Sequence, residues 1–186
     1  MRIIGLDPSF GGFAVCAWDG GNVELTTLKS ETEGQTWEQR RSRYVKFAAE
    51  VCRAVKATDQ PIFIEGYSFS SKNSRAHGTG EFGAILRLKL SQQFQVPIYE
   101  VTPTELKKFV IGKGVAQKPE MVSAVTLKLQ RPVADDNQAD AFGLMWIGRC
   151  VLGVENPGNA KRREIVDQIL KRHAAQPTQK KRRKPA

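Results

Sequence analysis

The chain has 186 residues, of which 40% are hydrophobic and 26% charged, and these values suit one folded domain with a sizeable core. No apolar run approaches the roughly eighteen residues that a membrane span needs, and no signal-peptide pattern opens the sequence, so we expect a cytoplasmic protein. Three widely separated cysteines and two distant histidines argue against a disulfide framework and against a classical zinc site.

The net charge of +10 is concentrated at the C-terminal end. Ten basic residues and two acids lie from Lys161 onward, so this segment carries +8 of the total. We therefore expect a globular domain over 1–153, a basic helix over 154–175 and a disordered basic tail over 176–186. A basic tail of this kind suits the phosphate backbone of a nucleic acid.

The predicted elements begin with strands rather than helices. Apolar runs over 1–7, 13–18 and 23–28 predict three antiparallel strands, the last two joined by a hairpin turn at Asp19-Gly20-Gly21-Asn22. Helical spacing follows over 37–56, a compact buried strand over 61–65, and a second helix over 80–93. We expect His77-Gly78-Thr79-Gly80 to be a loop before that helix, and its basic neighbours Lys72 and Arg75 suit a nucleic-acid backbone as the tail does.

The second half of the chain is mostly helical. A strand over 97–101 leads into Thr102-Pro103-Thr104-Glu105, which is a helix-start signature, and a proline opens a helix over 119–130. An apolar helix follows over 141–152, and a basic amphipathic helix is predicted over 160–175, with Ile165, Ile169 and Leu170 on its apolar side. This order of elements predicts a mixed α/β fold.

Three carboxylates stand at the ends of strongly apolar elements. Asp7 follows the first strand, Glu65 follows the strand over 61–65, and Asp140 lies one turn inside the late apolar helix. Burying an unpaired carboxylate is costly, so either each acid meets its own cation or several converge on metal ions. Oxygen donors without cysteine or histidine favour Mg²⁺ or Mn²⁺. Asp136 and Asn137 lie four and three residues before Asp140, so either shares its helix face.

A purely structural explanation exists for each acid taken alone. Asp7 would be a turn residue, Glu65 an ion-pair partner and Asp136 a helix N-cap. The set is harder to explain in this way, because capping does not require carboxylates at the ends of two nearly continuous apolar strands.

The same residues resemble the RuvC family of Holliday-junction resolvases. The resemblance covers about residues 1–153 and consists of Asp7-Pro8-Ser9, Ile64-Glu65, Lys107, Val110-Ile111-Gly112-Lys113-Gly114, Lys118 and Ala139-Asp140-Ala141. The segment from Glu65 to Lys72 is similar to the bacteriophage branch in particular.

The resemblance implies an RNase H-like fold and a homodimeric endodeoxyribonuclease that cuts Holliday junctions and other branched DNA. In such an enzyme, carboxylates hold two Mg²⁺ ions, or Mn²⁺ in their place, roughly 3.5–4 Å apart. Carried over by position, Asp7, Glu65 and Asp140 would be metal ligands. Lys107 and Lys118 would contact the phosphate backbone or steady the charge of the transition state. Lys113 would also contact DNA, and Tyr67 or Phe69 would stack on an unpaired base.

One position departs from the family pattern. The family commonly has an acid or a histidine three residues before its last aspartate, and this chain has Asn137 there. We expect Asp136 to take that place as a catalytic metal ligand, with Asn137 as the other candidate. Two further functions remain open from the sequence, namely an RNase H that acts on RNA–DNA hybrids and a non-catalytic binder of branched DNA.

Overall fold

A computed structural model describes residues 1–9, 12–30, 36–56, 59–67 and 75–174, with only the backbone at 59–60 and 75–76. Its strands and helices follow the predicted order: β1 Arg2–Asp7, β2 Phe13–Trp18, β3 Val23–Leu28, α1 Trp37–Ala54, β4 Asp59–Glu65, α2 Arg75–Phe94, β5 Ile98–Val101, α3 Pro103–Ile111, α4 Lys118–Leu129, α5 Asp136–Val151 and α6 Ala160–Ala174. No helix in the described part of the chain combines the length and the apolar character that a membrane span requires.

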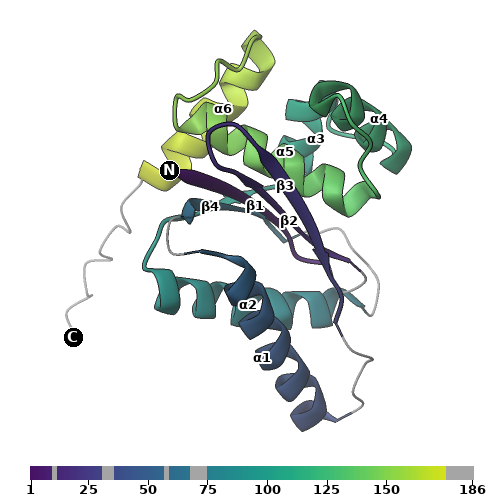
Figure 1. The fold of residues 1–186 in the computed structure, drawn as a ribbon, viewed down its shortest axis with the longest axis vertical. Helices are drawn as coiled ribbons and strands as arrows, with labels where there is room; N and C mark the ends of the chain where they lie inside the picture. The colour runs from purple at the N-terminus through teal and green to yellow at the C-terminus, as the bar shows by residue number, and fades with distance from the viewer. Residues whose placement is uncertain (10–11, 31–35, 57–58, 68–74, 175–186) are drawn as a thin grey trace, which may run out of the picture.

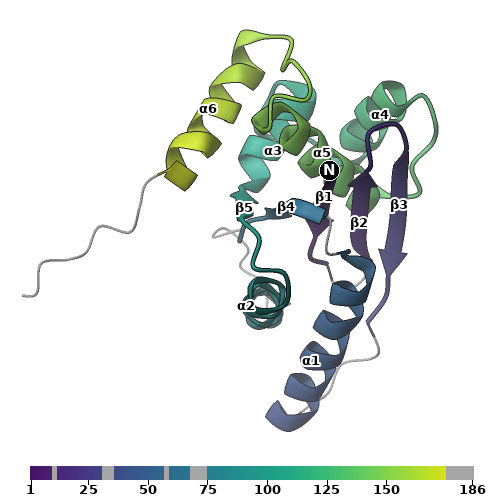
Figure 2. The ribbon, with the colours of Figure 1, turned by 60° about the vertical axis from the view of Figure 1, so that its left-hand side comes forward.

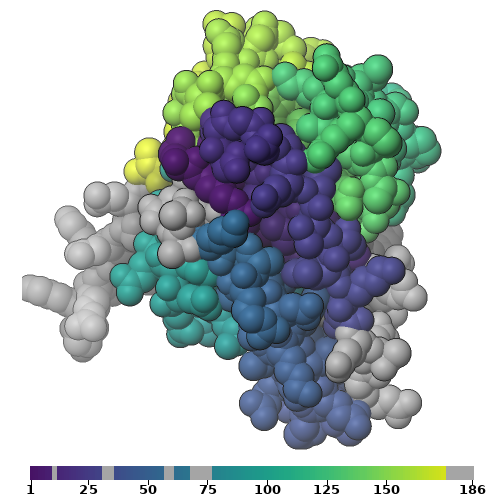
Figure 3. Space-filling model, in the orientation of Figure 1, coloured from purple at the N-terminus to yellow at the C-terminus, as the bar shows by residue number. Residues whose placement is uncertain are grey.

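The five strands form one mixed sheet in the order β3-β2-β1-β4-β5. β1 and β2 pair antiparallel, as do β2 and β3, whereas β4 runs parallel to β1 and β5 runs parallel to β4. The hairpin of β2 and β3 lies at the molecular surface seen in Figure 3, with α1 below it. The predicted mixed sheet with three antiparallel N-terminal strands is confirmed.

The sheet is the middle layer of three. α1 and α2 cover one face, while α3, α4, α5 and α6 lie on the other side (Figure 1). Side chains alternate along each strand, so Ile4 and Leu6 of β1 enter the core under α1 and α2, and Ile3 enters the core under α5. In β4, Ile64 likewise faces α1 and α2, whereas Phe63 faces α5.

α5 packs unusually close to the sheet because two glycines allow it. A Cβ on Gly5 of β1 would lie 2.2 Å from the carbonyl oxygen of Ala141, and a Cβ on Gly148 would lie 2.6 Å from the Phe63 ring. Neither approach is possible with a larger residue at these positions. Because Gly5 lies beside residues 141–145 and Ile3 beside Gly148, the N-terminal turns of α5 lie over the C-terminal end of β1.

The start of α2 corrects one prediction. The helix begins at Arg75 rather than near residue 80, so the segment His77-Gly78-Thr79-Gly80 is helical and not a loop. Glycine lowers helix propensity, and the sequence pattern therefore favoured a loop. Within α2, Gly83 gives room to Tyr67, because a Cβ there would lie 2.9 Å from the ring of Tyr67.

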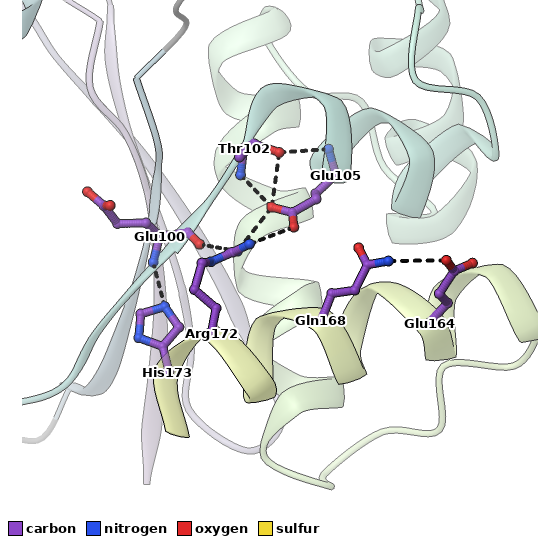
Figure 4. Close-up of polar contacts among 7 residues, drawn as sticks. All are labelled: Glu100, Thr102, Glu105, Glu164, Gln168, Arg172 and His173. Carbon is purple, nitrogen blue, oxygen red and sulfur yellow. Dashed lines mark hydrogen bonds and ion pairs between the residues drawn. The ribbon is translucent and has the colours of Figure 1, made fainter. Parts of the chain in front are cut away.

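α6 binds the exposed edge of the sheet (Figure 2). The Arg172 guanidinium pairs with the Glu105 carboxylate at 2.9 Å and donates to the carbonyl oxygen of Glu100 at 2.8 Å (Figure 4). The backbone N–H of Glu100 donates to Nε2 of His173 at 3.3 Å. These bonds satisfy backbone groups that an edge strand otherwise presents to other chains.

The apolar face of α6 differs from the prediction at one residue. Ile165 and Ile169 are buried as expected, but Leu170 is 40% exposed and Val166 is buried instead. Val166 lies next to Ile165 and three residues before Ile169, which keeps the buried stripe on the side that meets α3 and α5. The predicted disordered tail over 176–186 lies outside the described residues.

Candidate active site

Asp7 and Glu65 are brought to one face of the sheet by strand alternation. Asp7 is two residues beyond Gly5, and Glu65 is two residues beyond Phe63, so both side chains lie on the face covered by α5. β1 and β4 are adjacent and parallel, so their carboxyl ends meet at the same edge. The two acids therefore lie side by side under the first turns of α5.

The Asp7 carboxyl is buried and strongly perturbed. It is the one charged residue that is buried in the described part of the chain, at 5% exposure. Burial raises the pKa of Asp7 well above 3.8, and the charges of Glu65 and then Asp140 raise it further. Burial also raises the pKa of Glu65, against the lowering effect of the Lys107 charge and of a hydrogen bond from Asp7. Both pKa values are raised, so proton binding by these two acids is favoured.

Asp140, on α5, is the third carboxylate beside Asp7 and Glu65. Burial, followed by the charge of Glu65, raises the pKa of Asp140 to about 7. Its Oδ1 is buried and has no hydrogen-bond partner among the described residues. An unpartnered carboxylate oxygen beside two other acids costs free energy unless a cation binds there.

Asp136 and Asn137 differ in what they face. Asp136 forms an ion pair with Lys118 at the start of α4, and its charge raises the pKa of both Asp7 and Asp140. The amide nitrogen of Asn137 instead lies 2.9 Å from the point where a Cβ on Gly12 would stand. The predicted alternative role of Asp136 as the helix N-cap is wrong. Asp135 is the N-cap, because its carboxylate accepts from the backbone N–H of Gln138 at 2.9 Å.

Two of the four predicted lysines, Lys107 and Lys118, lie beside the acids. The positive charge of Lys107 on α3 lowers the pKa of Glu65 and of Asp140. The hydrogen bond with Asp136 raises the pKa of Lys118, whose side chain is otherwise 79% exposed. Lys113 lies in the α3–α4 connection and forms an ion pair with Glu120, which partly neutralises its charge.

Of the four other predicted DNA contacts, only Tyr67 is described in full. It is 37% exposed and lies two residues beyond Glu65. Phe69 and Lys72 lie outside the described residues, and of Arg75 only the backbone is described, as the first residue of α2.

Arg87 of α2 is a residue that the sequence did not single out. Its guanidinium donates to the carbonyl oxygen of Glu65 at 2.9 Å, pairs with Glu100 at 2.5 Å and lies 4.5 Å from the Tyr67 ring centre. These partners are 13 to 22 residues away in sequence, so helical periodicity carries no signal for them.

The three cysteines are buried and free, in agreement with a packing role.

The carboxylate oxygens are the ligand type that a hard divalent cation prefers. The side chains must rotate before they can bind one ion together. Four carboxylates gather here, and the buried oxygen of Asp140 lacks a partner within the described chain. As they lie, no three histidine, cysteine or acidic side chains among the described residues are close enough to hold one ion. The Asp7–Glu65 hydrogen bond and the Lys118–Asp136 pair engage oxygens that a metal ion would need.

Comparisons with known proteins identify the family to which this chain belongs. Residues 3–146 match the family model of the crossover junction endodeoxyribonuclease RuvC. Curated RuvC proteins of Pseudothermotoga lettingae and Thermosipho melanesiensis are 29% and 27% identical, over 84% and 78% of this chain and over 96% and 95% of their own length.

Solved structures give the same result for the fold. The Thermus thermophilus RuvC structure superposes with a TM-score of 0.57 at 20% identity, covering 78% of this chain and 91% of that one. The T. thermophilus RuvC structure in complex with Holliday junction substrate gives 0.58 at 22% identity, covering 78% and 90%. The predicted RNase H-like fold is confirmed, and the chain belongs to the RuvC family of crossover junction endodeoxyribonucleases.

Proposed function

We propose that this chain cuts four-way junctions and other branched DNA by metal-dependent phosphodiester hydrolysis, with its acids as the metal site. The observation that carries the proposal is the buried Asp7, which lies with Glu65 and Asp140 at one edge of the sheet. Burial raises the pKa of all three carboxyls, the charge of Glu65 raises the pKa of Asp7 and of Asp140 further, and a divalent cation would offset this repulsion.

Asp7, Glu65, Asp140 and Asp136 would hold Mg²⁺, with Mn²⁺ as a substitute. Bound ions of this kind supply an activated water and neutralise charge on the phosphate. Asp136 is favoured over Asn137 because its charge acts on both Asp7 and Asp140, while Asn137 lies against Gly12.

The lysines have separate roles in this proposal. The charge of Lys107 lowers the pKa of both Glu65 and Asp140, so this lysine lies close to both acids. It would therefore also lie close to the negative charge of a phosphate bound between them. Lys118 is held by Asp136 at the rim of the site and is mostly exposed, so it can turn to the phosphate when a cation takes its place. Both would stabilise negative charge in the transition state.

Tyr67, the lysines and the basic segment after α6 would bind the DNA around the cleavage site. A four-way junction offers two equivalent strands to cut, so a homodimer with two active sites suits the substrate. The bacteriophage branch, the cytoplasmic location, and the division into a nuclease domain, a basic helix and a tail remain predictions from the sequence.

The test is cleavage of a labelled synthetic four-way junction beside a matched linear duplex and an RNA–DNA hybrid, each with Mg²⁺, Mn²⁺ or EDTA. We expect paired, metal-dependent nicks in the junction that Asp7→Asn abolishes. Cleavage of the hybrid without the junction would make the chain an RNase H. Tight junction binding without cleavage under either metal would make it a structure-specific DNA binder.

A further inference from the structure

Two arginines of α6 bind the two ends of α3. At the C-terminal end of α3, Arg162 donates from Nε to the carbonyl oxygen of Phe109 at 2.7 Å and from Nη2 to that of Val110 at 3.3 Å. At the N-terminal end, Arg172 binds both carboxylate oxygens of Glu105, at 2.9 and 3.1 Å (Figure 4). The start of α6 thus meets the end of α3 and its end meets the start, so the two helices run antiparallel.

Both contacts restrict where α3 can lie. The last carbonyl oxygens of a helix have no partner within the helix, and a cation there also interacts favourably with the helix dipole. At the other end, Glu105 caps α3 by accepting from the backbone N–H of Thr102 at 2.8 Å, and its side chain is only 12% exposed. A bidentate arginine–carboxylate pair has a fixed geometry, so the placement of α3 depends on that of α6.

α3 carries Lys107, which acts on the acids of the candidate metal site. Beside this lysine, Leu106 packs against α5 at Gly143, where a Cβ would lie 2.6 Å from the Leu106 side chain. Gly143 is three residues after Asp140, so this contact lies about one helical turn from the acids. The charge of Lys107 lowers the pKa of Asp140 and of Glu65. A shift of α3 would therefore move the lysine relative to both acids.

We propose that Arg162 and Arg172 are positioning residues, which fix α3 so that Lys107 meets the phosphate at the cleavage site. The inference rests on the proposed function and deepens it, since it names what keeps a cation of the transition state in place. Misplacing a catalytic group by about 1 Å can lower a rate by about a hundredfold. Affinity for the junction depends instead on the number of phosphate contacts, so the two arginines should affect the rate more than the affinity.

The first measurement needs neither DNA nor metal. The amines of the full-length protein are acetylated to a low extent in EDTA, and mass spectrometry follows Lys107 in the wild type, Arg172→Met and Lys171→Met. Lys108 is the internal reference, because it is exposed whereas Lys107 is half-buried. We expect Arg172→Met to raise the labelling of Lys107 relative to Lys108 severalfold. Lys171→Met, which removes the same charge from an exposed neighbouring residue, should leave the ratio unchanged.

The second measurement is single-turnover cleavage of a four-way junction at saturating Mn²⁺ and protein. We expect Arg172→Met to lower the maximal rate by about tenfold or more, while its junction affinity in EDTA equals that of Lys171→Met. In a Lys107→Met background the same substitution should change the rate by less than about twofold, because the amine on which it acts is absent. Arg172→Lys should restore only part of the rate, since an ammonium cannot form the two parallel bonds. Arg162→Met should act like Arg172→Met, and thermal melting shows whether either variant fails to fold, in which case the other arginine provides the test.

Two results would overturn the inference. One is a folded Arg172→Met protein in which the labelling of Lys107 relative to Lys108 equals that of the wild type. The other is a rate that Arg172→Met leaves unchanged, or lowers by the same factor with and without Lys107, since α6 would then act elsewhere. Failure of the proposed function is distinct, because it would appear as a wild type that does not cut the junction. The labelling ratio would still decide whether α6 positions Lys107.

Discussion

Replacing Asp140 by asparagine should make the metal-free protein more stable. The Oδ1 atom of Asp140 is buried without a partner among the described residues, and an asparagine keeps the same shape there while removing the charge. The variant therefore isolates the electrostatic cost of one acid in the candidate metal site. Few substitutions in a core are expected to stabilise a protein, so the direction of the effect is informative.

The size and the pH dependence follow from the raised pKa. Folding moves the pKa of Asp140 from 3.8 to about 7, which at 1.36 kcal/mol per unit is a cost of up to about 4 kcal/mol at pH 8. Because the pKa of Asp140 is higher in the folded state, the folded protein holds a proton on this carboxyl at pH values where the unfolded chain has lost it. The cost is therefore complete above pH 7, shrinks as the pH falls through 7, and is absent below the unfolded value near 4.

The assay is thermal unfolding in EDTA from pH 8 to pH 5, repeated at pH 8 with Mn²⁺. For a chain of this size we expect the Asp140→Asn melting temperature to exceed that of the wild type by several degrees at pH 8. The gain should fall by more than half at pH 5, and saturating Mn²⁺ should reverse the order, because only the wild type keeps its ligands. A variant that is less stable at pH 8 in EDTA, or a gain that does not change with pH, would refute the reasoning.

Three further outcomes follow from the same geometry. Asp7→Asn should lower junction cleavage by more than about a hundredfold while keeping junction binding, measured by single-turnover kinetics and gel shift; a loss confined to binding would contradict its role at the metal. Asp136→Ala should raise the Mn²⁺ concentration needed for half-maximal cleavage far more than Asn137→Ala does, and equal effects would remove the distinction drawn between them. Gly5→Ala should destabilise by about 3 kcal/mol in urea unfolding, because its Cβ would lie 2.2 Å from a carbonyl oxygen of α5. Gly21→Ala, where the added Cβ meets open space, should stay within about 0.5 kcal/mol of the wild type.

The order of the elements and the acids of the site could be predicted from the sequence because both follow local rules. Apolar runs that end on Asp7 and Glu65 mark buried strands, and a capping pair such as Thr102 and Glu105 marks a helix start. The spacing of Asp136 and Asp140 places them on one helix face. These signals depend on residues a few positions apart.

What the sequence could not provide depends on distant contacts. The glycines of α2 favoured a loop by propensity, but the helix begins at Arg75, and Tyr67, which follows β4, packs against it at Gly83. The proximity of Asp140 to Asp7 depends on Gly5, which in isolation is an unremarkable strand residue. Arg87 gave no signal at all, since its partners come from β4, β5 and the segment after β4.

The arrangement of the acids leads to a last prediction about how cations bind. Without metal ions, two features reduce the charge repulsion: the raised pKa values of Asp7 and Glu65 favour a bound proton, and Asp136 pairs with Lys118. An ion that uses these oxygens must displace both the proton and the lysine. Because Asp140 also binds a proton at about pH 7, cation binding should release protons, and affinity should rise with pH between 6 and 8.

Calorimetric titration of the wild type with Mn²⁺ in two buffers of different ionisation enthalpy measures that release directly. We expect about one proton or more per chain at pH 7, and fewer for Asp140→Asn. Identical heats in the two buffers would mean that the acids are already ionised. The raised pKa values would then not describe the site, and the stabilisation expected for Asp140→Asn should be absent as well.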